Sequence, residues 1–260
     1  MPFHEKNGIR FYTFDLFPHS LLHGVITRRG GTSPAPWQSL NVGGTVGDDK
    51  QRVRANRQRS FDAFGRDLSS IFDVWQVHSA DVVCAEKPID PDTDLTQADI
   101  ILTDRPEVTL YMRFADCVPL LFHDPVRQVI GLAHAGWMGT MKGAGRAAVE
   151  AMQARYGCEP GNILAAVGPS IGPDHYEVGA DVIVKTREAF GADAERLLES
   201  RDGRTYLDLW TANYLQLRQA GVGQVEVAGL CTACHLEDWF SHRAEKGRTG
   251  RFGALMALRS

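Results

Sequence analysis

The chain has 260 residues, of which 43% are hydrophobic and 23% charged, and its formal net charge at pH 7 is -4. This composition is typical of a soluble globular protein long enough to bury a sizeable core, and it excludes disordered and fibrous classes. The slightly acidic charge also lacks the basic field that drives binding to phosphate backbones. We therefore expect a small-molecule ligand and no nucleic-acid partner.

The N-terminal segment and the cysteines indicate a cytoplasmic protein. Residues 1–17 lack the basic start and apolar core of a secretory signal, and no later apolar run approaches the length of a membrane span. The five cysteines are an odd number and are widely spaced, which argues against a disulfide framework. We expect no membrane partner, and we expect any special cysteine to be a metal ligand or a nucleophile.

The first elements in chain order are a loop and a helix. Residues 30–36 are rich in glycine and proline and predict a turn-rich loop. A second glycine-rich stretch, 43–47, precedes Asp48 and Asp49, either of which can start a helix that runs to about Phe64.

The remainder of the chain alternates groups of strands with helices. Short apolar and β-branched runs predict strands at 72–77, 81–85, 108–113, 118–122, 128–133, 163–167, 224–228 and 252–258. Helical patterns occupy 140–156, 178–190 and 206–219, and either Thr205 or Asp208 can cap the last helix, which Gly221 can end. Because regular βαβ alternation is missing, we expect a layered α+β fold with mixed sheets. No linker divides the chain, so residues 1–260 are predicted to form a single domain.

Three side chains able to bind a metal each follow or end a predicted strand: His78, Cys117 and His134. Two imidazoles and one thiolate suit zinc, and three protein ligands leave the fourth position open, as in catalytic sites. The wide separations match no local zinc motif, so spacing alone leaves open that these are ordinary core residues.

Two further motifs have alternative interpretations. Glycines at 136, 139, 143 and 145 follow His134, and they could expose backbone N–H groups to an anion or permit close helix packing. Residues 231–235, CTACH, match a haem-attachment pattern, which we reject because no export signal is present. Cys231 and Cys234 could form half of a structural zinc site completed by His235 or His242, or they could be ordinary buried thiols.

The ordered motifs as a set resemble the multicopper polyphenol oxidase or laccase-domain family, which is related to bacterial purine nucleoside phosphorylases. They span nearly the whole chain in order: Thr27–Gly31 (TRRGG), Ser39–Asn41 (SLN), Val46–Asp49 (VGDD), Gln76–His78 (QVH), Gln97–Asp99 (QAD), Ala115–Leu121 (ADCVPLL), His134–Trp137 (HAGW), Gly168–Pro173 (GPSIGP), Asp208–Trp210 (DLW), Cys231–Cys234 (CTAC) and Thr249–Arg251 (TGR).

This resemblance implies that His78, Cys117 and His134 bind Zn²⁺. It further implies phosphorolysis of adenosine, inosine, guanosine or methylthioadenosine, with phosphate as co-substrate, and deamination of adenosine. The implied fold has mixed sheets covered by helices in an α/β/β/α-type sandwich. This chain departs from the family pattern at Met138, where Arg or Lys is usual, and near Asp174 and His175, where cysteine is frequent.

Several neighbouring residues receive roles by hypothesis. Asp116, which adjoins a ligand, is assigned to proton transfer alongside the three ligands, and Asp99 to substrate binding or proton transfer. Arg28, Asn41 and Gln76 are assigned to orienting the substrate. Gly136 is assigned to the anion side of the pocket.

Three other functions remain open. A copper-dependent polyphenol oxidase would need a trinuclear cluster built from about eight histidines, conventionally in His-x-His pairs, whereas the chain has 9 histidines and no such pair. The His2Cys set could still bind copper in vitro, since copper outranks zinc in affinity. Cys117 could instead be the nucleophile of a Cys–His hydrolase. The third alternative is a binding module without catalytic activity.

Overall fold

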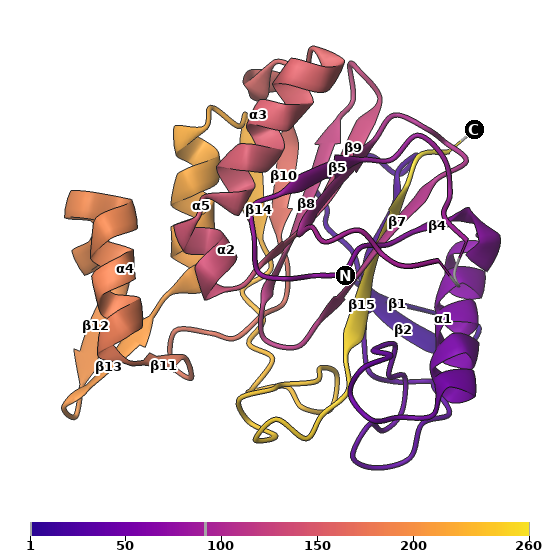
Figure 1. The fold of residues 1–260 in the computed structure, drawn as a ribbon, viewed down its shortest axis with the longest axis horizontal. Helices are drawn as coiled ribbons and strands as arrows, with labels where there is room; N and C mark the ends of the chain where they lie inside the picture. Colours follow the sequence, from indigo (N-terminus) through magenta and orange to yellow (C-terminus); the bar gives the residue numbers. More distant parts are fainter. Residues whose placement is uncertain (1, 91–92, 260) are drawn as a thin grey trace.

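The computed structural model describes residues 2–90 and 93–259, which fold around two six-stranded sheets (Figure 1). The first sheet has the strand order β1 (Phe3–Lys6), β2 (Ile9–Tyr12), β3 (Leu22–Ile26), β15 (Phe252–Ala257), β7 (Thr109–Phe114), β4 (Ile71–Phe72). The second has the order β14 (Gln224–Val227), β10 (Leu164–Val167), β8 (Val118–Asp124), β9 (Val129–Ala135), β6 (Ile100–Thr103), β5 (Val82–Cys84). Both are mixed, because β4–β7, β5–β6 and β10–β14 pair in parallel among otherwise antiparallel neighbours.

Helices cover the outer faces of the two sheets. The helix α1 (Lys50–Phe64) lies on the first sheet, and α2 (Trp137–Met141), α3 (Ala144–Tyr156) and α5 (Leu209–Gln219) lie on the second (Figure 1). At one side, α4 (Ala180–Phe190) stands beside a small sheet of β11 (Glu177–Val178), β13 (Arg204–Leu207) and β12 (Leu198–Arg201). This arrangement confirms the expected α+β fold with an α/β/β/α layering.

Alternation of side chains along the strands separates the buried residues into three layers. In β7, Leu110 and Met112 point into the core between the sheets, whereas Tyr111 packs toward α1. In β8, Leu121 joins that same central core, whereas Leu120 packs toward the helices of the second sheet. Strands covered on both faces are apolar throughout, which explains the uninterrupted hydrophobic runs in the sequence.

Short 3-10 helices at Leu68–Ser70, Pro160–Asn162 and Gly191–Arg196 complete the regular structure. The predicted cap of α1 is confirmed at Asp49, whose carboxylate accepts hydrogen bonds from the backbone N–H groups of Gln51 and Arg52 at 3.0 Å. Asp208 likewise caps α5, so Thr205, which lies in β13, is excluded as the cap.

Two predicted elements are wrong in their extent. The strand predicted at 72–77 ends at Phe72, because the buried Asp73 turns toward Arg113 instead of continuing the ladder. The helix predicted at 140–156 is two helices, since Gly143 has a φ of +81° and interrupts it. Several strands were not predicted, namely β1, β2, β3, β6, β11, β12 and β13.

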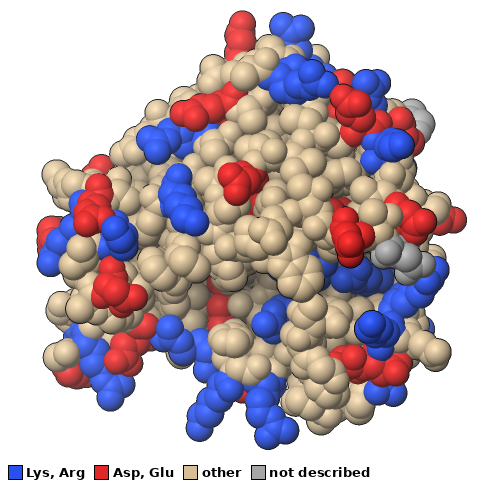
Figure 2. All heavy atoms as spheres, in the orientation of Figure 1, with Lys and Arg blue, Asp and Glu red and all other residues tan. Residues whose placement is uncertain are grey.

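Surface charge is mixed over the face drawn in Figure 2, where acidic side chains alternate with lysines and arginines and basic side chains gather at the lower edge. Among the described residues, no helix is long and apolar enough to cross a membrane.

Candidate metal centre

Strand pairing brings together the three side chains predicted to bind a metal. His134 ends β9, and the antiparallel register pairs Val118 with Ala135, so Cys117 lies beside the same strand end. His78 approaches from the loop after β4. The three ligand atoms lie within 4.8 Å of one another, with the Cys117 Sγ 3.9 Å from the His78 Nε2.

The carboxylate of Asp99 orients both histidines. Its Oδ1 lies 2.7 Å from the Nδ1 of His134, which leaves the Nε2 of that ring facing the cluster. Its Oδ2 accepts hydrogen bonds from the backbone N–H groups of Val77 at 3.0 Å and Ser79 at 2.7 Å, the two neighbours of His78. A carboxylate behind a ligating histidine is the usual partner that fixes its tautomer and orientation. Asp99 is fully buried, which places it behind the ligands and away from any substrate.

Gly136 gives the ligands room to approach. A Cβ at this position would lie 2.8 Å from the Sγ of Cys117 and 3.0 Å from the Cδ2 of His78. Glycine is therefore needed for packing at this position, directly before α2. Its predicted role at the anion side of the pocket stays a prediction, since Gly136 is not among the residues that line the cavity.

The electrostatics favour a thiolate at the centre. Burial alone would raise the pKa of Cys117, but the adjacent His134 imidazole lowers it to about 6. For His134 the two effects have the opposite signs. Burial disfavours its charged form and would lower its pKa, but Cys117 and Asp99 raise the pKa to about 9. A divalent metal can replace the shared proton, because metal ligands bind in their deprotonated forms. Two imidazoles and a thiolate thus fit zinc, and they also fit copper.

The cluster opens into a cavity of about 660 Å³. This volume lies in the range of small-ligand pockets. The side chains and backbone that line it come from both sheets and from the C-terminal loop: Gly43, Gly44, Thr45, Arg57, Trp75, Gln76, His78, Leu95, Arg113, Ala115, Asp116, Cys117, His134, Tyr176, His242, Arg243 and Arg251.

Four arginines make this cavity favourable for an anion. Arg113 pairs with the buried Asp73 at 2.6 Å, and Arg57 lies 3.7 Å from the same carboxylate. Within residues 2–90 and 93–259, neither Arg243 nor Arg251 has a carboxylate within ion-pair distance. The Nη1 of Arg243 donates to the Glu177 carbonyl at 2.7 Å, and the Nη1 of Arg251 donates to the Gly250 carbonyl at 2.8 Å. The remaining N–H groups of these two side chains can bind an anion such as phosphate.

Two of the proposed site residues line the cavity with their polar groups already engaged. The Oε1 of Gln76 accepts from the backbone N–H of Arg113 at 3.0 Å, and its Nε2 donates to the Arg113 carbonyl at 2.8 Å. The carboxylate of Asp116 accepts from the Thr232 hydroxyl at 2.7 Å and from the Arg243 backbone N–H at 2.6 Å. Both residues therefore shape the wall. The predicted role of Gln76 in orienting the substrate and that of Asp116 in proton transfer stay hypotheses.

The other two lie apart from the cavity. Asn41 is fully buried, and its side chain holds the backbone of Gly43 and of Arg251, both of which do line the wall. Arg28 stacks on Phe240 and pairs with Glu245 at 3.1 Å, in a separate hollow. The structure thus offers Arg28 no contact with a ligand in the cavity.

Sequence reasoning missed the aromatic and histidine walls. Trp75 is 47% exposed, an unusual state for tryptophan, and directly precedes the Gln76–His78 motif. Tyr176 follows the predicted rim turn, and His242 precedes Arg243. The position of Trp75 directly before the Gln76–His78 motif is the sequence signal that could have indicated its place in the cavity wall.

Comparisons with known proteins cover nearly the whole chain. A family model described as multi-copper polyphenol oxidoreductase laccase matches residues 22–259. A purine nucleoside phosphorylase of Deinococcus radiodurans is 41% identical over 236 residues, covering 91% of this chain and 88% of the relative. The purine nucleoside phosphorylase YlmD of Geobacillus stearothermophilus is 38% identical over 245 residues, covering 91% and 89%.

Solved structures match equally completely. The crystal structure of YlmD from Geobacillus stearothermophilus superimposes with a TM-score of 0.93 at 34% identity, covering 100% of this chain and 99% of that one. A Bacillus licheniformis hypothetical protein, YfiH, gives a TM-score of 0.92 at 34% identity, covering 99% of each chain. These likenesses support the architecture described above throughout its length.

Proposed function

The chain belongs to the family of multi-copper polyphenol oxidoreductase laccases, and we propose that it is a zinc-dependent purine nucleoside phosphorylase. The proposed substrates are adenosine, inosine, guanosine and methylthioadenosine with inorganic phosphate, and adenosine deamination is proposed as a second activity. The observation that carries the proposal is one cavity that joins the His2Cys cluster to two arginines, Arg243 and Arg251, and to two aromatic side chains, Trp75 and Tyr176.

Each part of a purine nucleoside and phosphate has a suitable counterpart in this cavity. Aromatic rings stack on the flat faces of bases, which suits Trp75 and Tyr176 to the purine. Guanidinium groups bind phosphate oxygens with two parallel hydrogen bonds, which suits Arg243 and Arg251 to the phosphate. The names of the Deinococcus and Geobacillus relatives support the same substrate class.

In the proposed phosphorolysis, a phosphate oxygen forms a bond to the ribose C1′ while the bond from C1′ to the purine nitrogen breaks. The electron pair of that bond leaves with the base, which then takes up a proton. Asp116 is the candidate for this proton transfer that the sequence indicates, and His242, which also lines the cavity, is the second candidate. The products are ribose 1-phosphate and a free purine.

Zn²⁺ held by His78, Cys117 and His134 would supply Lewis-acid stabilisation of negative charge in the cavity. The chain itself contributes the orientation of the ligands through Asp99 and the aromatic walls of the cavity. In the proposed deamination, a water oxygen forms a bond to the purine C6 and the bond from C6 to the amino nitrogen breaks. A proton from the water passes to that nitrogen, so the products are inosine and ammonia. Because both reactions would use one cavity, the concentrations of phosphate and adenosine should alter the ratio of phosphorolysis to deamination.

Copper-dependent oxidation of phenols is the second candidate, favoured by the family model's description and by the donor set, which also suits copper. Within the described residues, the groups able to hold a metal contain at most two histidines each. A trinuclear copper cluster conventionally requires far more. Oxygen consumption with a phenolic substrate, in protein carrying zinc and in protein loaded with copper, separates this function from the phosphorylase.

A Cys–His hydrolase is the third candidate, since the lowered pKa of Cys117 beside His134 would also suit a nucleophile. Such an enzyme would work with a strong chelator present. The proposed phosphorylase would lose activity under the same conditions, so chelation decides between the two.

The test combines metal analysis with chromatography of adenosine and inosine, incubated with and without phosphate. We expect zinc bound at the His2Cys cluster, and phosphate-dependent release of free base that Cys117→Ala abolishes together with that zinc. The matched control is Cys84→Ser, which changes a half-buried cysteine outside both metal-capable groups and should retain both. Turnover of neither nucleoside by zinc-loaded protein would refute the substrate assignment.

A further inference from the structure

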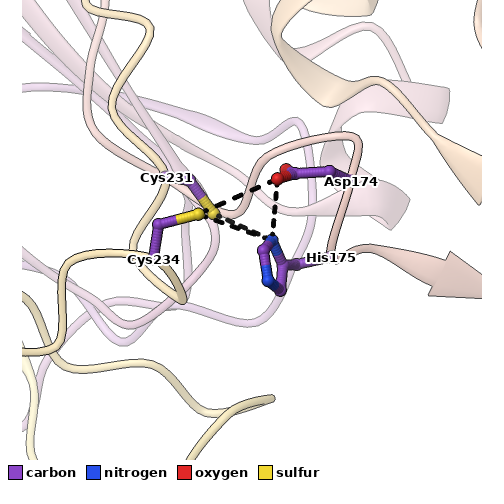
Figure 3. A group of neighbouring side chains, drawn as sticks. All are labelled: Asp174, His175, Cys231 and Cys234. Carbon is purple, nitrogen blue, oxygen red and sulfur yellow. Dashed lines mark hydrogen bonds and ion pairs between the residues drawn. The ribbon is translucent and has the colours of Figure 1, made fainter.

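A second group of metal-capable side chains lies outside the cavity, where two loops meet (Figure 3). Asp174 and His175 belong to the loop between β10 and β11, and Cys231 and Cys234 belong to the loop after β14. Their ligand atoms all lie within 4.8 Å of one another. None of the four belongs to the His2Cys cluster, and none lines the cavity.

The separations within this second group match those of a tetrahedral zinc site. The Nδ1 of His175 lies 3.8 Å from the Cys231 Sγ and 3.6 Å from the Cys234 Sγ. The Oδ2 of Asp174 lies 3.8 Å from the Cys234 Sγ and 3.1 Å from the His175 Nδ1. Ordinary zinc bond lengths at tetrahedral angles place sulfur about 3.5 Å from nitrogen or oxygen, and nitrogen about 3.3 Å from oxygen. These four separations differ from those values by about 0.3 Å or less.

The backbone around these donors holds the two loops together. The N–H of Gly172 donates to the Cys231 Sγ at 3.2 Å, an outer hydrogen bond of the kind that stabilises a metal-bound thiolate. A Cβ at Gly172 would lie 2.8 Å from the Oδ1 of Asp174 and 3.1 Å from the Cβ of Cys231, so glycine permits the close approach. Ser170 and Cys231 also form an isolated parallel bridge.

The ligand partners differ from those expected from sequence. His235 lies 3.3 Å from Glu237 on its own turn, and His242 faces the cavity, so neither completes the pair of cysteines. Distant residues do so instead, because the parallel pairing of β10 with β14 brings the loops after both strands to one place. Sequence spacing could not show this, since the two loops are far apart in the chain.

We propose that Cys231, Cys234, His175 and Asp174 form a second zinc site, four-coordinate and structural. Four protein ligands close the coordination sphere, which is the pattern of structural and not of catalytic zinc. Asp174, His175 and Cys234 are exposed and Cys231 is buried, so the ion can enter from solvent.

This site would fasten one wall of the cavity. The loop that supplies His175 continues directly into Tyr176, and the guanidinium of Arg243 lies 5.0 Å from the Tyr176 ring. The loop that supplies the cysteines carries Thr232, whose hydroxyl donates to Asp116 at 2.7 Å. A zinc ion bound by both loops would hold them together. It would thus keep Tyr176, which lines the cavity, close to the loop of Thr232, which supports Asp116.

The experiment counts zinc per chain in the full-length protein after zinc loading and desalting. We expect two zinc ions in the wild type, one in Cys234→Ser and one in His175→Ala. His235→Ala is the matched control, because it removes a neighbouring exposed histidine outside the group, and it should retain two. Cys117→Ala should lose the other ion, so a combined Cys117→Ala, Cys234→Ser protein should hold none.

X-ray absorption at the zinc edge gives an independent readout. The wild type should show on average one and a half sulfur neighbours per zinc at about 2.3 Å, and Cys117→Ala, which keeps only the second site, should show two. Zinc that remains unchanged in Cys234→Ser and His175→Ala would overturn the proposal. A persistent Cys231–Cys234 disulfide would also overturn it. The disulfide would be detected by mass spectrometry without added reductant, and it would have to remain after the protein is incubated with zinc and a thiol reductant. These readouts do not depend on nucleoside turnover.

Discussion

Replacing Asp99 with asparagine tests the buried carboxylate that supports the metal centre. In the native protein this carboxylate accepts from Val77, Ser79 and His134. An amide of the same size has only one oxygen, so its NH2 group must face either the two backbone donors or the Nδ1 of His134. Asp99→Asn therefore either leaves a buried donor without an acceptor or forces His134 into the tautomer whose Nε2 carries the proton and cannot bind a metal.

The expected loss has two parts. Burial alone would raise the pKa of Asp99, but hydrogen bonds from His134, Ser79 and Val77 lower it to about 2, below the usual 3.8 of aspartate. Because the pKa of Asp99 is lower in the folded protein than in the unfolded chain, its carboxylate contributes folding stability at pH values above the unfolded-state pKa. That contribution is lost as the pH falls through the folded-state pKa. Removing the charge should cost about 2 kcal/mol at neutral pH. Zinc affinity should fall by roughly 10–100-fold, as for other carboxylates behind ligating histidines.

The two quantities are measured separately. Urea unfolding of the zinc-free protein at neutral pH and near pH 3 gives the free energy of unfolding, and the deficit of the variant should be smaller at the lower pH. Competition with a chromophoric chelator gives the zinc affinity. Asp202→Asn is the matched control, because Asp202 is exposed and has a positive φ that asparagine tolerates.

One result would refute this reasoning. If Asp99→Asn lost stability but bound zinc at the His2Cys cluster within twofold of the wild type, Asp99 would only brace the loops and would not orient the ligands. For this comparison the zinc affinity is measured in proteins that also carry Cys234→Ser, so that zinc at the proposed second site does not mask a change at the His2Cys cluster.

Three further changes follow from the geometry. Gly136→Ala should weaken zinc binding roughly tenfold or more, because its Cβ would meet two candidate ligands at 2.8 and 3.0 Å, whereas Gly161→Ala has open space and should not. Arg251→Gln should raise the KM for phosphate roughly tenfold in a phosphate-saturation series, the value of one charge-assisted hydrogen bond, and Arg146→Gln on the exposed face of α3 should leave it unchanged. Burial lowers the pKa of His23 to about 4 from the usual 6.5 of histidine, so the wild type should lose up to about 3 kcal/mol of folding stability as the pH falls from 6.5 to 4. His23→Gln should flatten that part of the stability profile in pH-dependent urea unfolding, and an unchanged slope would show that another group titrates.

The long apolar runs were predictable because burial on both faces of a strand removes the polar alternation. The run at 118–122 lies within β8, and the run at 128–133 matches β9 from Val129 onward; every residue of both strands is buried. The edge strands were not predictable on this basis. β1 has one half-buried residue followed by three exposed ones, so its hydrophobic pattern is too weak to distinguish from a loop.

Candidate ligands could be listed from sequence, but their supporting residues could not. Asp99 was assigned to substrate or proton transfer, yet its hydrogen bonds to Val77, Ser79 and His134 depend on a tertiary approach. Arg28 was assigned to the substrate because it lies in a motif, and the structure pairs it with Glu245 far along the chain. A sequence motif indicates which residues occur together, whereas only the fold shows which of their side chains face the cavity.

The scattered motifs meet where the chain crosses from one sheet to the other. β7 ends in the first sheet at Phe114, β8 begins in the second sheet at Val118, and Asp116 makes the crossing with a φ of +79°, a conformation that aspartate adopts more readily than most residues. The register of β7 against β15 pairs Phe114 with Phe252, so Arg251 arrives beside the crossing.

On the other sheet, the register of β8 against β9 places His134 next to Cys117. A thiolate, two imidazoles and the guanidinium of Arg251 are thus assembled by two strand registers and one turn. This dependence explains why the ligands share no local spacing. A shift of either register by one residue would send the inward side chains to the opposite face and would dismantle the site without changing any ligand.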